Sequence, residues 1–147
     1  MRSASILALT LLVTAACAER EPATVQIVSP EEGATIVGDS VPVVLTASGV
    51  EIVPADGEPT PGRAHHHLFL DTDVSPAGEP IPDETDVPGL KHLGTGVSNW
   101  TFKDVEPGRH RLIAVLALGD HVPLDPWVTD TVHFTVVPDT AAEGEAE

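Results

Sequence analysis

The chain has 147 residues, of which 23 are acidic and 7 are basic, so its formal net charge at neutral pH is −16. This charge, with no basic patch, argues against nucleic-acid binding, because the phosphates would repel the chain. The length suits one domain with a buried core. The only cysteine, Cys17, has no partner for an internal disulfide, so we expect packing to supply the stability.

The N-terminal segment has the layout of a secretory signal. A basic start is followed by an apolar run over residues 6–13 and by small residues before Cys17. We interpret 1–17 as a signal peptide with a lipobox-like cysteine, which predicts an exported, membrane-anchored lipoprotein that faces the periplasm or the cell exterior. Thr14 stands where the lipobox prefers leucine. The alternative is an ordinary cleavage near Ala16 that releases a free protein.

Residues 18–23 are polar and charged, as in a tether, and 139–147 form a small-residue acidic tail that we expect to be disordered. Between them, over 24–138, short runs rich in valine, isoleucine and threonine are separated by proline and glycine, a pattern typical of a β-sandwich. We therefore expect almost no helix. The predicted strands are 25–29, 41–47, 66–71, 90–93, 99–102, 110–118 and 128–136.

Two of these segments constrain the architecture. The run 110–118 is apolar on both faces, which predicts a central strand, and 128–136 alternates apolar and polar residues as a half-buried antiparallel strand does. About seven short strands predict an all-β fold, a single immunoglobulin-like antiparallel β-sandwich with long loops. The longest loop, 72–89, is rich in proline and acidic residues, and loops of this length are usually functional or mobile.

Three consecutive histidines, His65, His66 and His67, open the strand predicted near 66–71. Side chains alternate along a strand, so His65 and His67 share one face at a Cα separation of about 6.8 Å, while His66 points to the other face. At this spacing two imidazoles can share one metal ion.

Further ligands are available in the loops. His92 or His121, both beside glycines, can supply a third imidazole. Asp120 or Asp71 can supply a carboxylate that either binds the metal or accepts a hydrogen bond from a histidine ligand. Zinc and copper(II) are the metals that imidazole suits, and no methionine follows Met1 to form a thioether copper(I) site.

The alternative for all these histidines is that their rings bond backbone carbonyls and brace the loops without a metal. We prefer that interpretation for His110, which follows a Pro-Gly turn, and for His133, which lies on the polar face of its strand.

From Ala64 onward the chain resembles a bacterial exported family known as domain of unknown function 4399. The shared motifs, in order, are Ala64-His65-His66-His67-Leu68, Pro76-Ala77-Gly78-Glu79-Pro80-Ile81-Pro82, His92-Leu93-Gly94-Thr95-Gly96, Pro107-Gly108-Arg109-His110 and Gly119-Asp120-His121-Val122-Pro123. The segment 25–34 also resembles the start of the family. The chain departs from the family pattern at Val97-Ser98-Asn99 and at Leu124-Asp125-Pro126-Trp127. The resemblance implies an exported domain with recurrent histidines and no established activity.

Other chemistries are less well supported. An EF-hand counted from Asp71 would have Pro76 and Pro82 at its sixth and twelfth positions, so that motif is absent, and only a looser calcium site among Asp71, Asp73, Asp83, Glu84 and Asp86 remains. No Gly-x-Ser-x-Gly motif is present. A metal-dependent hydrolase with Glu79 or Glu84 as its base is the enzymatic alternative.

The sequence thus favours a non-catalytic envelope protein, anchored to the membrane by lipid, whose histidines bind zinc or copper(II). The alternative is a structural or protein-interaction module of the envelope without a metal, in which the histidines brace the loops and an envelope partner docks on them.

Overall fold

The computed structural model describes residues 21–140, which form nine strands and no helix. The strands are β1 (Thr24–Ser29), β2 (Thr35–Val37), β3 (Val41–Ser48), β4 (Glu51–Ile52), β5 (Arg63–Leu70), β6 (Leu90–Leu93), β7 (Asn99–Phe102), β8 (Gly108–Ala117) and β9 (Thr129–Val137). The signal peptide expected at 1–17 with Cys17, half of the 18–23 tether and most of the 139–147 tail lie outside the described residues. Within 21–140, no helix is long and apolar enough to cross a membrane.

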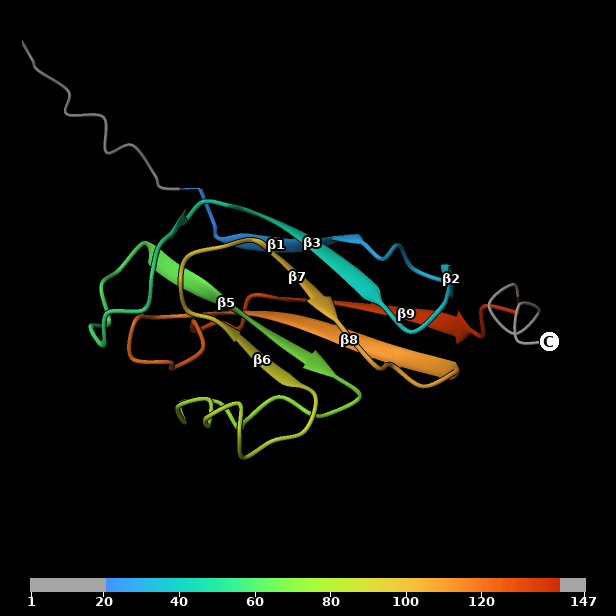
Figure 1. The fold of residues 1–147 in the computed structure, drawn as a ribbon. Helices are drawn as coiled ribbons and strands as arrows, with labels where there is room; N and C mark the ends of the chain where they lie inside the picture. Colours follow the sequence, from blue (N-terminus) through green and yellow to red (C-terminus); the bar gives the residue numbers. More distant parts are fainter. Residues whose placement is uncertain (1–20, 141–147) are drawn as a thin grey trace, which may run out of the picture.

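The strands form two sheets that face each other (Figure 1). The smaller sheet has the order β1-β3-β7, and the larger has the order β2-β9-β8-β5-β4, with β6 also paired to β5. The arrangement is the predicted immunoglobulin-like sandwich, in which β9, β8 and β5 take the places of strands G, F and C. The start of the chain is shared between the sheets, because β1 belongs to the smaller one and β2 to the larger one.

All seven predicted strands are present, with ends within three residues of the expected positions. The two unexpected strands, β2 and β4, are three and two residues long and pair in parallel with β9 and β5. The sequence predicted a wholly antiparallel sandwich, and these two parallel pairs show that this part of the prediction is wrong. Segments this short show no apolar alternation, so the pattern that revealed the other strands could not reveal these two.

The core between the sheets follows from strand alternation. On β3, Val41, Val43 and Leu45 are buried and the residues between them are exposed. They face the buried side chains of the larger sheet, which include Ala64, Leu68, Leu112, Ala114, Leu116, Val132, Phe134 and Val136. Full burial of each large aliphatic side chain contributes about 1.5–3 kcal/mol before entropy is counted.

The larger sheet is also covered on its outer side. Phe69 of β5 and Val115 and Ala117 of β8 point away from the main core and pack with Ile81 and Leu90 in a second apolar cluster. Ile81 belongs to the long segment between β5 and β6, residues 71–89, which we call the cover loop and which lies below the larger sheet in Figure 1. The central position predicted for 110–118 is confirmed, since β8 lies between β9 and β5.

Hydrogen bonds to several parts of the sandwich hold the cover loop in place. Leu70 N donates to Gly89 O at 2.8 Å, and Ile81 N donates to His121 O at 2.9 Å. Arg111 Nη2 donates to Asp73 Oδ1 at 2.7 Å. The loop is thus held at its base and at its middle, and one of these contacts reaches a histidine expected to bind metal.

His110 is a bracing residue. Its Nδ1 lies 2.7 Å from Asp71 Oδ2 and its Nε2 lies 2.8 Å from Glu106 O, so both ring nitrogens face acceptors, as in a protonated imidazole. Burial lowers the pKa of His110, but the bonds to Asp71 and Glu106 outweigh it and raise the pKa above its ordinary value. His133 is exposed, and its backbone N donates to Glu32 Oε2 at 2.7 Å.

The bonds of His110 predict a pH-dependent contribution to stability. Because the folded pKa is raised, the contribution is complete below the unfolded pKa and is lost as the pH rises through the folded pKa. We expect His110→Ala to cost roughly 1–2 kcal/mol more at about pH 6 than at about pH 9 in urea unfolding of both proteins. An equal loss at the two pH values would contradict a protonated His110.

Candidate metal centre

Four histidines from three parts of the chain converge on the outer face of the larger sheet. His65 and His67 alternate on β5 and share the face of Phe69, toward the cover loop. His92 on β6 is the cross-strand partner of His67, and His121 lies in the turn after β8. One ligand nitrogen from each of the four lies within 4.8 Å of the others. Across residues 21–140, this four-histidine cluster is the only group of three or more potential ligands that could hold a metal ion.

Backbone hydrogen bonds build the turn that carries His121. His121 N donates to Leu118 O at 2.9 Å, and Leu118 N donates to Val122 O at 2.9 Å. His121 has a φ of 69°, in the left-handed region that few residues other than glycine adopt. Asp120, expected as a ligand or an acceptor behind the ligands, instead accepts from Val122 N at 3.2 Å. The structure therefore brings four of the five expected residues together, and Asp120 is not in the cluster.

The spacing of the rings is close to that of a metal site. His65 Nε2 and His67 Nε2 are 2.9 Å apart, and the ring centroids of the four residues are separated by 4.5 to 5.5 Å. Zinc–nitrogen bonds of about 2.0–2.1 Å place the nitrogens of a tetrahedral site roughly 3.3 Å from one another. This spacing falls between the 2.9 Å of the His65–His67 pair and the 4.8 Å within which all four ligand nitrogens lie.

Several nitrogens of the cluster lack a hydrogen-bond partner in the described part of the chain. They are His65 Nδ1, His67 Nδ1 and His92 Nε2, all buried. A buried polar atom without a partner costs about 1–3 kcal/mol, and native proteins contain few of them. Three such atoms in one small volume leave the cluster unsatisfied without a ligand. A metal ion takes one nitrogen from each ring, so an ion held by Nε2 of His65 and His67 would satisfy Nε2 of His92 and leave the two Nδ1 atoms without a partner.

Three histidines of the cluster, His65, His67 and His92, have lowered pKa values and so favour the neutral form. Burial, followed by the charges of His92 and His121, lowers the pKa of His65 to about 4. Burial, followed by the charge of His65, lowers the pKa of His67 to about 2. Burial also lowers the pKa of His92. At neutral pH these rings hold free lone pairs, so a metal ion would not have to displace protons from them.

His66 lies outside the cluster, as its place between His65 and His67 predicts. Its side chain is fully buried on the inner face of β5, where Nε2 lies 3.3 Å from Ser98 Oγ. Burial lowers the pKa of His66 to about 4. Like the other two rings of the triplet, it has an unpaired Nδ1. Its position makes it part of the core and separates it from any ion bound by its neighbours.

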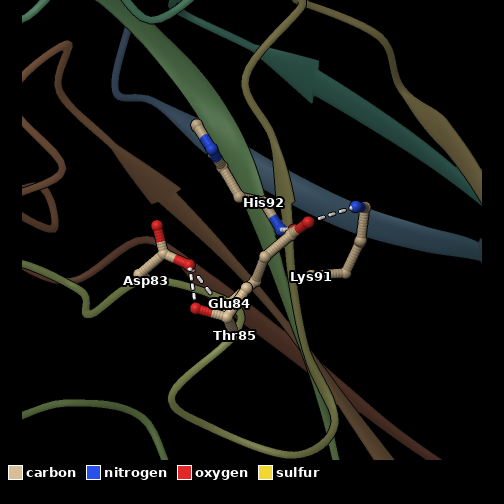
Figure 2. Close-up of polar contacts among 5 residues, drawn as sticks. All are labelled: Asp83, Glu84, Thr85, Lys91 and His92. Atoms are coloured by element: carbon tan, nitrogen blue, oxygen red, sulfur yellow. Dashed lines mark hydrogen bonds and ion pairs between the residues drawn. The ribbon is translucent and has the colours of Figure 1, made fainter.

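Carboxylates of the cover loop lie beside the cluster (Figure 2). Glu84 Oε1 accepts from Lys91 Nζ at 2.7 Å, and Glu84 Oε2 accepts from His92 N at 2.9 Å, so this side chain fixes the backbone of a cluster residue. Asp83 Oδ1 accepts from both Thr85 N, at 2.9 Å, and Thr85 Oγ1, at 2.8 Å. These hydrogen bonds, with a smaller effect of His92, lower the pKa of Asp83.

The five acidic residues considered for calcium do not converge in the described structure. Asp71 and Asp73 bind Arg111, whereas Asp83 binds Thr85. Both oxygens of Glu84, one candidate base for a hydrolase, are engaged in the bonds described above. The other candidate, Glu79, is exposed and does not belong to the cluster.

Two surface hollows meet the cluster at His92 and His121. The acidic hollow, of about 320 Å³, is lined by Pro82, Asp83, Glu84, Thr85, His92 and His121. The apolar hollow, of about 470 Å³, is lined by Ala55, Lys91, His92, Leu93, Gly94, Thr95, Val97, Trp100 and His121. Lys91 Nζ lies 4.3 Å from the centre of the Trp100 ring. The cluster is therefore reached from two sides that differ in charge.

Gly94 is a residue of this site that the sequence argument did not single out for a role. A Cβ atom built at Gly94 would overlap Cε1 and Nε2 of the His92 ring, so only glycine leaves room for that ring. Gly94 lies in the turn directly after β6, and its place two residues after His92 was the available signal.

The sequence matches the family described as Domain of unknown function (DUF4399) over residues 43–137. The chain belongs to this family. All four histidines of the cluster lie within the matched segment of the DUF4399 domain. No curated protein matches the chain.

Solved structures similar to the DUF4399 protein are distant in sequence. The fibronectin(III)-like modules of Clostridium thermocellum CbhA are 17% identical, with 78% of this chain and 98% of that chain covered and a TM-score of 0.46. An engineered protein is 13% identical, with 80% and 21% covered and a TM-score of 0.46. An extracellular domain from B. thetaiotaomicron is 9% identical, with 75% and 12% covered and a TM-score of 0.43. The chain thus spans about a fifth or less of the last two proteins.

The packing of Gly94 against His92 predicts how substitution would act. Gly94→Ala should displace the His92 ring and weaken metal binding by about tenfold or more, since one of four ligands is lost. Isothermal titration calorimetry with zinc measures the change. His92→Ala should cause a similar loss, and the double variant should lose little more, because both act through one ring. Additive losses would contradict this account of Gly94.

Proposed function

We propose that this DUF4399 protein is a non-catalytic metal-binding protein whose four-histidine cluster holds one zinc or copper(II) ion. The observation that carries the proposal is the convergence of four imidazoles, among which three buried nitrogens lack a partner in the described residues. The low pKa values of His65 and His67 support it, because neutral imidazole is the form that binds metal.

The donor set supports these two metals. Four imidazoles suit the tetrahedral geometry of zinc or the tetragonal geometry of copper(II). Sulfur ligands, which select copper(I), are absent from residues 18–147 of the sequence. Four protein ligands also resemble the closed coordination of structural sites, whereas catalytic zinc keeps a position for water. With Glu84 engaged by Lys91 and His92, this set supports a binding role rather than hydrolysis.

We also propose that the protein is exported and anchored to the envelope membrane through lipid on Cys17. The basic start, apolar run and small residues of 1–17 support this proposal. The strong negative charge supports a soluble domain outside the membrane rather than one adsorbed to anionic headgroups. A metal ion is then the expected partner of the domain, and an envelope protein a further one.

Titration with zinc and with copper(II) tests the metal proposal. We expect saturation at one equivalent and a rise in melting temperature, because a metal at a hundred times its Kd stabilises the folded state by about 2.7 kcal/mol. His65→Ala combined with His67→Ala should abolish the binding, whereas His133→Ala, which removes an exposed histidine outside the cluster, should not change it.

His121→Ala provides a second variant at a partly exposed position, in case the double substitution in the core of the cluster prevents folding. It should weaken binding and leave the circular dichroism spectrum unchanged. Metal affinity that is the same in wild type and in both cluster variants would overturn the proposed ligands and leave the histidines as braces of the cover loop.

The anchor is tested separately. Cys17→Ser should move the protein from the detergent phase to the aqueous phase in Triton X-114 partition, because a serine cannot carry the thioether-linked lipid. The mass of the mature wild-type protein should show the added acyl chains. Partition of both proteins into the aqueous phase would indicate ordinary cleavage near Ala16.

A further inference from the structure

The two hollows beside the four-histidine cluster differ in the charge that they present to an approaching cation. Both include His92 and His121, so either could lead an ion to the ligands. The acidic hollow adds Asp83 and Glu84 to that pair, whereas the apolar hollow adds Lys91 and Trp100. A divalent cation is attracted to the first hollow through Asp83, whereas the second offers no net negative charge, because Lys91 is paired with Glu84.

Within the acidic hollow the two carboxylates are not equivalent. Glu84 forms an ion pair of 2.7 Å with Lys91, so its negative charge is compensated. Asp83 is exposed and has no ion pair in the described part of the chain. Its Oδ1 is held by two bonds from Thr85, which leaves Oδ2 available to a cation or its water shell. Asp83 is thus the uncompensated negative charge at this side of the cluster.

The apolar hollow presents the opposite arrangement. Lys91 Nζ lies over the Trp100 ring at 4.3 Å while it is paired with Glu84, so the ammonium group is fixed at the boundary between the two hollows. Trp100 and Val97 are exposed in this hollow, and their side chains offer no ligand atom to zinc or copper(II). A metal ion taking this route would meet no carboxylate before it reached His92 and His121.

We propose that metal ions reach the four-histidine cluster through the acidic hollow, and that Asp83 captures the hydrated cation before His92 and His121 replace its water. This inference rests on the proposed metal-binding function and extends it, because it assigns the path and a residue that sets the association rate. Asp83 is a positioning residue for the incoming ion and is separate from the four final ligands.

Stopped-flow mixing of the full-length chain with copper(II) tests the path, with quenching of tryptophan fluorescence as the signal. Trp100 lines a hollow that contains two of the ligands, so bound copper(II) lies near it, and Trp127→Phe in all samples removes the second tryptophan. The test variant is Asp83→Asn, whose amide oxygen can still accept both bonds from Thr85. The control is Asp86→Asn, which makes the same charge change at an exposed position of the cover loop outside the hollow.

At low ionic strength, Asp83→Asn should slow association roughly three- to tenfold, the effect should shrink as salt is added, and the dissociation rate should not change. Asp86→Asn should associate at close to the wild-type rate. Equal rates for wild type and Asp83→Asn, or equal slowing in both variants, would overturn the path. A faster dissociation with an unchanged association rate would overturn it too, because it would make Asp83 a ligand.

The equilibrium titration of the wild-type chain separates the two levels of the proposal. Binding at one equivalent with no effect of Asp83→Asn on association would refute the path and leave the metal site standing. No binding by the wild-type chain would refute the metal site, and the path with it.

Discussion

The alternation of side chains along β5 is the constraint on which the rest of the structure depends. The strand lies inside the larger sheet, between β8 on one side and β4 and β6 on the other, and its residues 64–69 are buried on both faces. Its even-numbered residues complete the core between the sheets, and its odd-numbered residues must be covered from outside. The cover loop, the second apolar cluster and the four-histidine cluster all follow from this second buried face.

Histidine is a destabilising residue on a buried face unless its ring nitrogens are hydrogen-bonded or bind a ligand. An imidazole is large enough to fill space, but each ring brings two polar nitrogens that must be satisfied. The structure meets this requirement for His110, whose nitrogens both face acceptors, and leaves it unmet in the cluster. The two histidine environments therefore respond to pH in opposite senses, because the pKa is raised at His110 and lowered at His65 and His67.

The sequence predicted the fold class and the strands that bury an apolar face, because alternation and doubly apolar runs are direct consequences of that burial. It also named the four histidines, but only the pairing of β5 with β6 and the turn after β8 brought His92 and His121 to His65 and His67. Strand alternation depends on neighbouring residues and can be predicted from the sequence. Pairing between segments that are distant in the chain cannot be predicted in this way. For the same reason Asp120 was expected in the cluster and is instead used by its own turn, while Gly94 and Asp83 acquire their roles only in three dimensions.

The separation of the cluster residues along the chain has a mechanical consequence. A bound ion would join β5, β6 and the turn after β8, and so close two successive loops through a chain that has no disulfide. Such a cross-link forms and opens without an oxidant or a reductant. Resistance of the domain to pulling forces and to proteases would then depend on the concentration of metal around it. It would not depend on the redox potential of the compartment in which the protein folded.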